Sequence, residues 1–316
     1  MKQFAYLDDG SSVRTVDPAE AAAAGDVHLT WIHLDFNDPA TRPFLLEQVH
    51  LQEVVANALT ATETRPRCEP MEDGALVNLR GLSEEEAPEA DSLVSIRLWI
   101  GHGRIISLGR YTLRAMPTMC HAMKMGHVKD PGDFVAMLGD AITGQLDPEV
   151  AALGDTLDDC ELELDATKAF SLRRKIATVR SKAIEYRRFV APQRQALGRL
   201  AGLECGWLEP DDRLHLNESA DRFARMAEEL ESIRERAALM HEQITDLHAE
   251  QTEQRALLVS VLALIFLPLT FLTGLFGMNV KLPYQEEPWA FEAIMGLSLA
   301  VVVVGIGYFM RARWFR

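Results

Sequence analysis

The sequence predicts an α+β membrane protein: an N-terminal cytosolic α/β domain, a long helical stalk and two C-terminal transmembrane helices. Three observations support this class. Strand-like and helical patterns alternate over residues 1–147, apolar residues then recur at helical spacing over 148–255, and two uncharged runs, 256–280 and 293–310, follow. A quarter of all residues are charged, so the average composition conceals the apolar end of the chain.

Both periodicities of secondary structure occur within the first domain. Four segments show the alternation of a half-buried strand: 29–36, 75–79, 94–100 and 104–108. A helix is expected after the start signal Asp38-Pro39. Its apolar positions would be Phe44, Leu45, Val49, Val54, Val55 and Leu59. The glutamate-rich segment 83–91 contains a proline and is expected to be an exposed loop.

The stalk, residues 148–255, carries two helical stripes. The first stripe ends at Pro192 and consists of Leu172, Ile176, Val179, Ala183, Tyr186 and Val190. The second resembles a coiled-coil seam and consists of Phe223, Met226, Leu230, Ile233, Ala237, Met240, Ile244 and Leu247. No Pro or Gly lies between Pro210 and Pro268, so this helix should continue into the first span. A helix of that length must pack on other helices or on further copies of itself.

Charge around the spans predicts their orientation. Basic residues follow the second span (291–310) in the tail 311–316, at Arg311, Arg313 and Arg316. The connector 281–290 contains Glu286 and Glu287 and only one lysine. The positive-inside rule therefore places both termini in the cytosol and the connector in the periplasm. The N-terminus lacks the apolar core of a signal peptide, so the expected location is a bacterial-type inner (plasma) membrane.

Composition excludes several classes of function. The net charge of −15 opposes binding to nucleic acid, whose phosphates are also negative. The four cysteines are far apart and form no CxxC pair, so reduced cytosolic thiols are expected. The sequence shows no phosphate-binding loop and no nucleophile motif, so no enzyme activity and no catalytic cofactor are predicted. The remaining partners are the lipid bilayer, metal ions and further copies of the chain.

Small and hydroxylated residues form one stripe on the first span, 256–280. They are Ala256, Ser260, Ala263, Leu267, Thr270 and Gly274. Two spans cannot enclose an aqueous path, so transport would need several copies around an axis lined by this stripe. The same residues would equally serve an ordinary contact between helices. The stripe alone leaves both interpretations open.

The end of this span decides between the two interpretations. Gly277-Met278-Asn279 stands at the outer end of the first of two C-terminal spans, and in this position it resembles the signature of the CorA superfamily of divalent cation transporters. The segments 63–68, 73–81, 92–99 and 191–194 are similar to the ZntB zinc-transporter branch of that superfamily. The resemblance implies a funnel-shaped homopentamer with the first span lining the pore and the second outside it. After the signature, Lys281-Leu282-Pro283-Tyr284 replaces the glycine-rich turn frequent in that branch.

Together, the resemblance and the residue types suggest roles along an ion path. Five copies of Asn279 would form a ring of amide oxygens that accepts hydrogen bonds from a hydrated cation without removing its water. Gly277 would permit a tight turn, Met278 would pack against neighbours, and Thr270 would form a second polar ring. Glu286 and Glu287 are candidates for cation attraction outside, unless they are a solvated loop. Candidates for the inner vestibule are Glu242, Asp246 and Glu253.

The sequence gives little information on which divalent metal ion the pore prefers. Neither span contains His or Cys, the usual zinc ligands, so the pore should pass a hydrated ion and discriminate poorly among Zn²⁺, Mg²⁺, Co²⁺ and Ni²⁺. The alternatives to a zinc transporter are a CorA-type Mg²⁺/Co²⁺ channel and a non-conducting membrane-tethered sensor or scaffold. Soft ligands in the cytosolic part are candidates for regulatory metal sites, although ordinary histidines and thiols are commoner: Cys120, His121, His127, His241 and His248.

Overall fold

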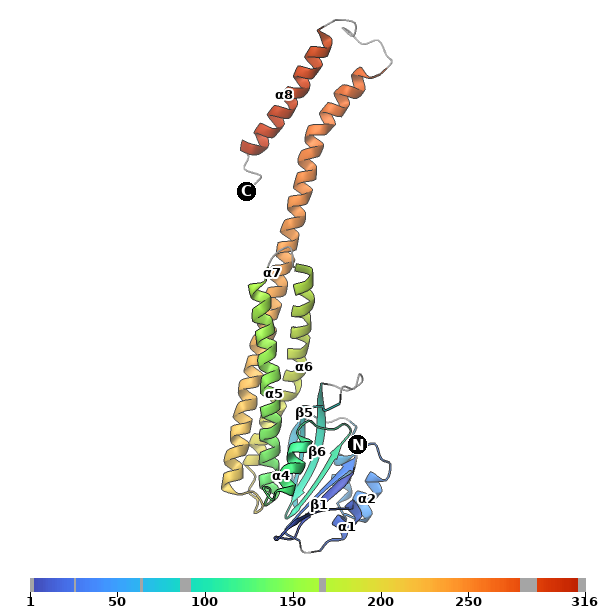
Figure 1. The fold of residues 1–316 in the computed structure, drawn as a ribbon, viewed down its shortest axis with the longest axis vertical. Helices are drawn as coiled ribbons and strands as arrows, with labels where there is room; N and C mark the ends of the chain where they lie inside the picture. Colours follow the sequence, from blue (N-terminus) through green and yellow to red (C-terminus); the bar gives the residue numbers. More distant parts are fainter. Residues whose placement is uncertain are drawn as a thin grey trace. The chain divides into compact units, whose positions relative to one another are not determined.

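The computed structural model describes residues 3–25, 27–62, 65–85, 92–164, 169–278 and 289–311 (Figure 1). The chain forms two compact units. The first contains Met1–Leu164 and Phe170–His241, and the second contains Asp165–Ala169 and Glu242–Arg316. Most of the predicted stalk, up to His241, thus belongs to the same compact unit as the sheet. The following paragraphs take the first unit alone.

A seven-stranded mixed sheet forms the centre of the first unit, in the order β2-β1-β3-β7-β6-β5-β4. The strands are β1 (Phe4–Asp8), β2 (Val13–Val16), β3 (Leu29–Asp35), β4 (Arg67–Met71), β5 (Gly74–Leu82), β6 (Leu93–Gly101) and β7 (Arg104–Gly109). Only β3 and β7 pair in parallel; the other neighbours are antiparallel. The four predicted strands are confirmed as β3, β5, β6 and β7.

Helices cover both faces of the sheet. On one face lie α1 (Pro18–Ala23), α2 (Thr41–Glu47) and α3 (Glu53–Leu59), and their apolar side chains join those of β1, β3 and β7 in one buried cluster. On the other face, α4 (Met116–Lys124) and α5 (Pro131–Leu162) pack, with the ring of Phe134 4.8 Å from that of Trp31. The N-terminal domain is thus a three-layer α/β/α arrangement (Figure 1).

The helix expected after Asp38-Pro39 is in fact two helices. Between α2 and α3, His50 adopts a φ of 59°, a left-handed conformation that ends a helix. The apolar face of α3 is therefore not continuous with that of α2. On α3, Val55 and Leu59 are buried and Val54 is 68% exposed. Val54 therefore does not share the buried face of Val55 and Leu59, unlike the single apolar stripe that the sequence suggests. In the expected loop 83–91, Ser83 forms a bridge with Leu113, and residues 86–91 lie outside the described part of the chain.

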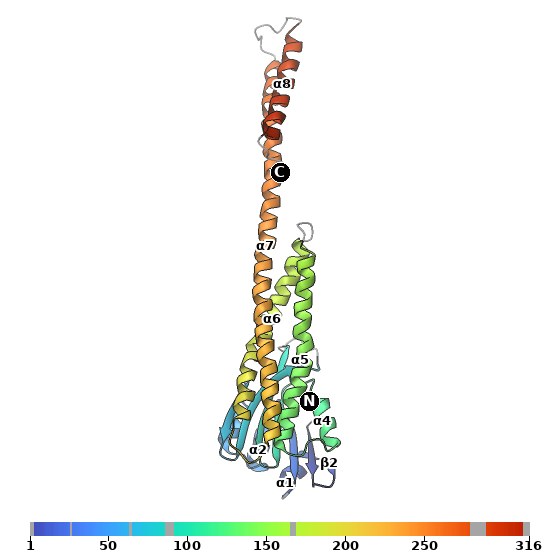
Figure 2. The same ribbon diagram turned by 90° about the vertical axis from the view of Figure 1, so that its left-hand side faces the viewer.

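Three helices form the elongated part of the first unit: α5, α6 (Ala169–Ala201) and the beginning of α7 (Pro210–Phe276). Figures 1 and 2 show them side by side, with α5 also against the sheet. Both predicted stripes are buried within this unit, from Leu172 to Val190 on α6 and from Phe223 to Met240 on α7. Burial of the stripes holds the bundle together.

Two internal prolines contradict the predicted helix boundaries. α5 continues through Pro148 and α6 continues through Pro192, although an internal proline costs a helix about 3 kcal/mol. The neighbours Leu146, Val150 and Val190 are fully buried. Burial of each such side chain contributes about 1.5–3 kcal/mol, which offsets the local cost of the proline. The predicted end of a helix at Pro192 is therefore wrong.

Ion pairs set the register between the helices. Arg222 of α7 donates to Asp140 and Asp147 of α5, at 2.7 and 2.8 Å. Two heptads further along α7, Arg236 pairs with Asp158 and Glu161 of α5, at 2.5 and 2.8 Å. Pairs with this much exposure contribute about 0–1 kcal/mol each to stability, so their main effect is to fix how α7 slides along α5.

The N-termini of α5 and α7 meet at a buried carboxyl. Asp212 accepts a 2.8 Å hydrogen bond from the backbone N–H of Glu209 and so caps α7. A Cβ on Gly132, in the first turn of α5, would lie 2.1 Å from Oδ2 of Asp212, so only glycine permits this approach. Burial, together with the charges of Asp130 and Asp133, raises the pKa of Asp212 to about 6.

This carboxyl predicts a pH dependence of stability. Because the folded state holds the proton of Asp212 more tightly than the unfolded state does, stability falls as the pH rises from about 4 to about 6, and the penalty persists above that. Asp212→Asn keeps the cap acceptor without the charge. It should raise the free energy of unfolding by about 1 kcal/mol at pH 8, after allowance for partial solvation, and by less at pH 5.

Thermal unfolding of the full-length protein at both pH values measures this difference. The exposed Asp221→Asn, on the same helix, is the matched control and should change the melting temperature equally little at both. A gain for Asp212→Asn that is the same at pH 5 and pH 8 would contradict the assignment.

Candidate functional site

The second unit contains the two helices that can cross a membrane. They are the end of α7, from Glu242 to Phe276, and α8 (Ala290–Arg311). Both pass the test of length and apolar composition for a membrane span, and their most apolar windows are only 6% and 0% buried. Apolar helices this exposed are not core helices of a soluble fold. They indicate a surface made for lipid or for further copies of the chain.

α7 presents different faces to α8 and to its surroundings. Val261, Ile265, Leu269 and Leu272 are among its buried or half-buried residues, and a Cβ on Gly305 of α8 would lie 3.4 Å from Cγ1 of Ile265. All six residues of the predicted pore stripe, from Ala256 to Gly274, are exposed. At about 100° per residue, the stripe is centred roughly opposite the face that contacts α8. It therefore lies on an exposed face of the first span, as do Phe266 and Phe271.

Hydroxyl groups on this span have their hydrogens already engaged. Ser260 donates to the carbonyl of Ala256 at 2.8 Å, and Thr270 donates to that of Phe266 at 2.8 Å. Thr273 does the same with Leu269 at 3.0 Å. Each hydroxyl thus offers its surroundings only oxygen lone pairs. Such an acceptor suits a hydrated cation, whose water presents hydrogens outward. The sequence pattern indicates the hydroxyls but not this orientation.

The described part of the signature motif is tightly wound. The N–H of Gly277 donates to the carbonyl of Thr273 at 2.9 Å, and a Cβ on Gly277 would lie 2.9 Å from that same oxygen. Real Cβ atoms do not approach so closely, so glycine is required here. Met278 is 53% exposed. Asn279, Glu286 and Glu287 lie outside the described residues.

Carboxylates continue along α7 on the side of the stripe. Glu242, Asp246 and Glu253 are all exposed, and they are centred about 60° from the middle of the stripe in helical projection. His248, two residues after Asp246, is exposed, whereas His241 is half-buried in the first unit, in a small groove with Ile176 and Ala237. The two histidines are two helical turns apart on α7.

The candidate regulatory ligands of α4 do not converge. The thiol of Cys120 hydrogen-bonds with Tyr6, and burial raises its pKa while that of Tyr6 is raised to about 12. His121 and His127 are exposed. Among the described residues, no group of three His, Cys, Asp or Glu side chains is close enough to hold a metal ion. Within one chain, these positions do not make a complete metal site.

The fold and these faces define the class: an integral membrane protein with two spans, the first of which keeps a small, hydroxyl-bearing face free. Comparisons agree. The model of the family described as CorA-like Mg2+ transporter protein matches residues 26–311. The chain belongs to this family, whose members are transporters of divalent cations.

Individual relatives extend over nearly the whole chain. The zinc transport protein ZntB of Pectobacterium carotovorum is 32% identical over 90% of this chain and 87% of its own. The solved structure of the full-length CmaX protein is 28% identical, with a TM-score of 0.80 and coverage of 98% and 97%. The CorA magnesium transporter from Methanocaldococcus jannaschii also reaches 0.80, over 99% of both chains, at 17% identity, and this likeness concerns the fold.

Proposed function

We propose that this protein transports zinc as its principal cargo, through a pore that five copies build from their first spans. Transport of divalent cations follows from the family. The preference for zinc is supported by relatives named zinc transport protein ZntB, which are 30–32% identical to this chain. The single observation that carries the pore is the exposure of the whole stripe from Ala256 to Gly274 on the face opposite α8.

Packing supports a shared axis. A lone chain would leave the small residues and the hydroxyl oxygens of this face in lipid, where the close helix contact that small residues permit is not used and the oxygen lone pairs meet no water. Assembly of several copies with α8 outside would move the stripe to a common axis, where its hydroxyl oxygens meet water. A pentamer in the inner membrane, with both termini and Arg311, Arg313 and Arg316 on the cytosolic side, completes this proposal.

The ion path would keep the cation at least partly hydrated. Asn279 would offer amide oxygens at the outer mouth, and Thr270 would offer hydroxyl oxygens deeper in the span. Glu286 and Glu287 would attract cations outside, and Glu242, Asp246 and Glu253 would do so on the inner side. Neutral oxygen rings discriminate weakly, so Co²⁺, Ni²⁺ and Mg²⁺ are expected as slower cargo. The cytosolic His and Cys positions remain predictions that would need ligands from a second copy.

Replacing Asn279 with Ala tests the outer ring. Purified protein is reconstituted in liposomes that contain a zinc-sensitive dye, and the initial rate of zinc entry is measured. Loss of all amide oxygens at the mouth should lower this rate at least about tenfold, the effect of about 1.4 kcal/mol on a rate-limiting barrier. Asn217→Ala, an exposed position on α7 in the first unit, is the matched control and should leave the rate unchanged.

Other outcomes would assign the protein differently. Faster entry of Mg²⁺ or Co²⁺ than of Zn²⁺ would indicate a CorA-type channel, which the description of the family model favours. Absence of flux for every cation, with Asn279→Ala identical to the parent, would indicate a non-conducting sensor or scaffold. Repeating the assay with an imposed pH gradient shows whether protons drive transport.

A further inference from the structure

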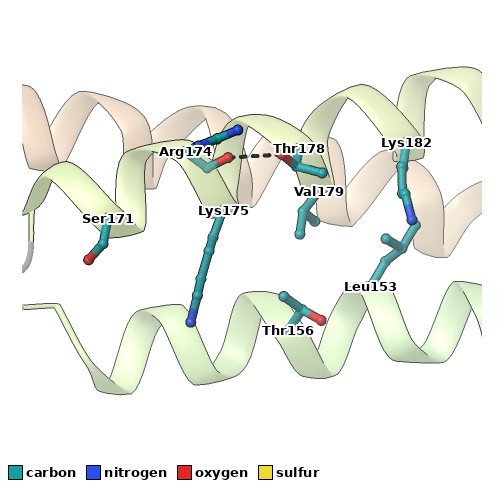
Figure 3. Close-up of a pocket in the computed structure, with 8 residues that line it drawn as sticks. All are labelled: Leu153, Thr156, Ser171, Arg174, Lys175, Thr178, Val179 and Lys182. Carbon is teal, nitrogen blue, oxygen red and sulfur yellow. Dashed lines mark hydrogen bonds between the residues drawn. The ribbon is translucent and has the colours of Figure 1, made fainter.

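A groove runs between α5 and α6 in the first unit. Its cavity measures about 520 Å³, within the range of small-molecule sites in proteins. Leu153 of α5 and Val179 of α6 form an apolar floor and are almost fully buried. Figure 3 shows these two side chains facing each other, with Thr156 beside Leu153 on the α5 side.

The rim of the groove is cationic. Arg174, Lys175 and Lys182 line it, and none of the three has an ion pair with a carboxylate of the described residues. In Figure 3, Lys175 and Lys182 extend from α6 toward α5, on either side of Val179. Seven residues along a helix correspond to about 10 Å. Two ammonium groups therefore flank an apolar floor.

The charge of this surface contrasts with that of the chain. The protein carries a net charge of −15, yet α6 has basic residues in large excess and a single acidic one, Glu185. The threonine hydroxyls of the groove are uncharged and do not compete with an anion for the rim. Thr156 and Thr178 donate to the carbonyls of Ala152 and Arg174, at 2.7 and 3.0 Å. The rim of the groove is thus positively charged on a protein that is acidic as a whole.

We propose that this groove binds a soluble organic anion with an apolar body, such as an aromatic or medium-chain carboxylate. The carboxylate would pair with Lys175 and Lys182, and the apolar body would cover Leu153 and Val179. The rim opposes any metal cation, and the apolar floor gives no advantage to an inorganic anion. An acidic helix of another copy is about 10 Å wide, too wide to reach floor residues that are already 92% and 97% covered.

Calorimetry with 2-naphthoate tests the proposal on the full-length protein in nanodiscs of neutral lipid, with empty nanodiscs as the blank. Saturable binding with one site per chain is expected. The uncharged 2-naphthamide should bind at least tenfold more weakly. Lys175→Gln with Lys182→Gln should weaken naphthoate binding at least tenfold, and Thr156→Trp, which fills the groove from an exposed position, should do the same with the charges intact.

A matched control removes the same charge elsewhere on α6. Arg173→Gln with Arg194→Gln alters two exposed cations outside the groove and should change the affinity less than twofold. Equal weakening by the two double variants would overturn the proposal in favour of a general electrostatic effect. Absence of saturable binding to the parent protein, as when another copy covers the groove in the assembly, would also overturn it. Zinc flux is not part of this readout, so the result is independent of the proposed pore.

Discussion

Replacing Phe223 with Ala is expected to lower the free energy of unfolding of the first unit by about 3–5 kcal/mol. Phe223 is 1% exposed in the seam of α7, so truncation removes a buried ring and leaves a cavity among α5, α6 and α7. In a unit of this size each kcal/mol lowers the melting temperature by about 2–4 °C. The first thermal transition should therefore fall by roughly 10 °C.

The fluorescence of Trp31, Trp99 and Trp207, all in the first unit, reports this transition in the full-length protein. Leu214→Ala is the matched control, because Leu214 lies on the same helix but is 64% exposed. It should change the melting temperature by no more than about 2 °C. Equal effects of the two substitutions would show that the seam of α7 does not pack as described.

The helical seams could be predicted from the sequence, because a stripe at steps of three and four depends only on local order along the chain. The helix boundaries could not be predicted as well. Pro148 and Pro192 are strong local signals for an end, but Leu146, Val150 and Val190 beside them are buried by segments far away in the sequence. Tertiary packing of this kind overrides the local signal and is invisible in a single stretch of residues.

The sheet shows the same limit. The strands β5, β6 and β7 are buried along nearly their whole length and are rich in apolar residues. The short edge strand β2 is exposed along much of its length, and the other edge strand, β4, contains Pro70. Edge strands tolerate exposed residues and proline. The apolar pattern that predicts a strand is therefore weak in them. The parallel pairing of β3 with β7 joins segments about 75 residues apart. No local pattern specifies it.

The candidate site could be proposed from the sequence where residue type alone carries the chemistry. Small and hydroxylated residues at helical spacing indicated the stripe, but only the position of α8 against Val261 and Ile265 shows that this stripe lies on an exposed face. The sequence did not show how the candidate soft metal ligands are arranged in space. Cys120 and His121 are neighbours in the chain, yet the thiol is buried beside Tyr6 while the imidazole is exposed.

Gly277→Ala is expected to reduce zinc flux about five- to hundredfold while the protein remains folded. The new Cβ would lie 2.9 Å from the Thr273 carbonyl oxygen, which accepts the hydrogen bond of Gly277 itself. Relief of this clash requires a backbone shift at the end of α7, and overpacking of this kind costs about 1–3 kcal/mol. Since each 1.4 kcal/mol is a factor of ten in the occupancy of a conformation, the conducting arrangement of the motif becomes a minority state.

Gly296→Ala provides the matched control for this substitution. Gly296 lies on α8, and a Cβ there would meet no atom within 4 Å, so flux should stay within about twofold of the parent. The melting temperature of the first unit should be unchanged in both variants, because the clash in Gly277→Ala is confined to the second unit. Full flux from Gly277→Ala would mean that the turn after α7 relaxes freely, and the geometry of this glycine would then have no part in conduction.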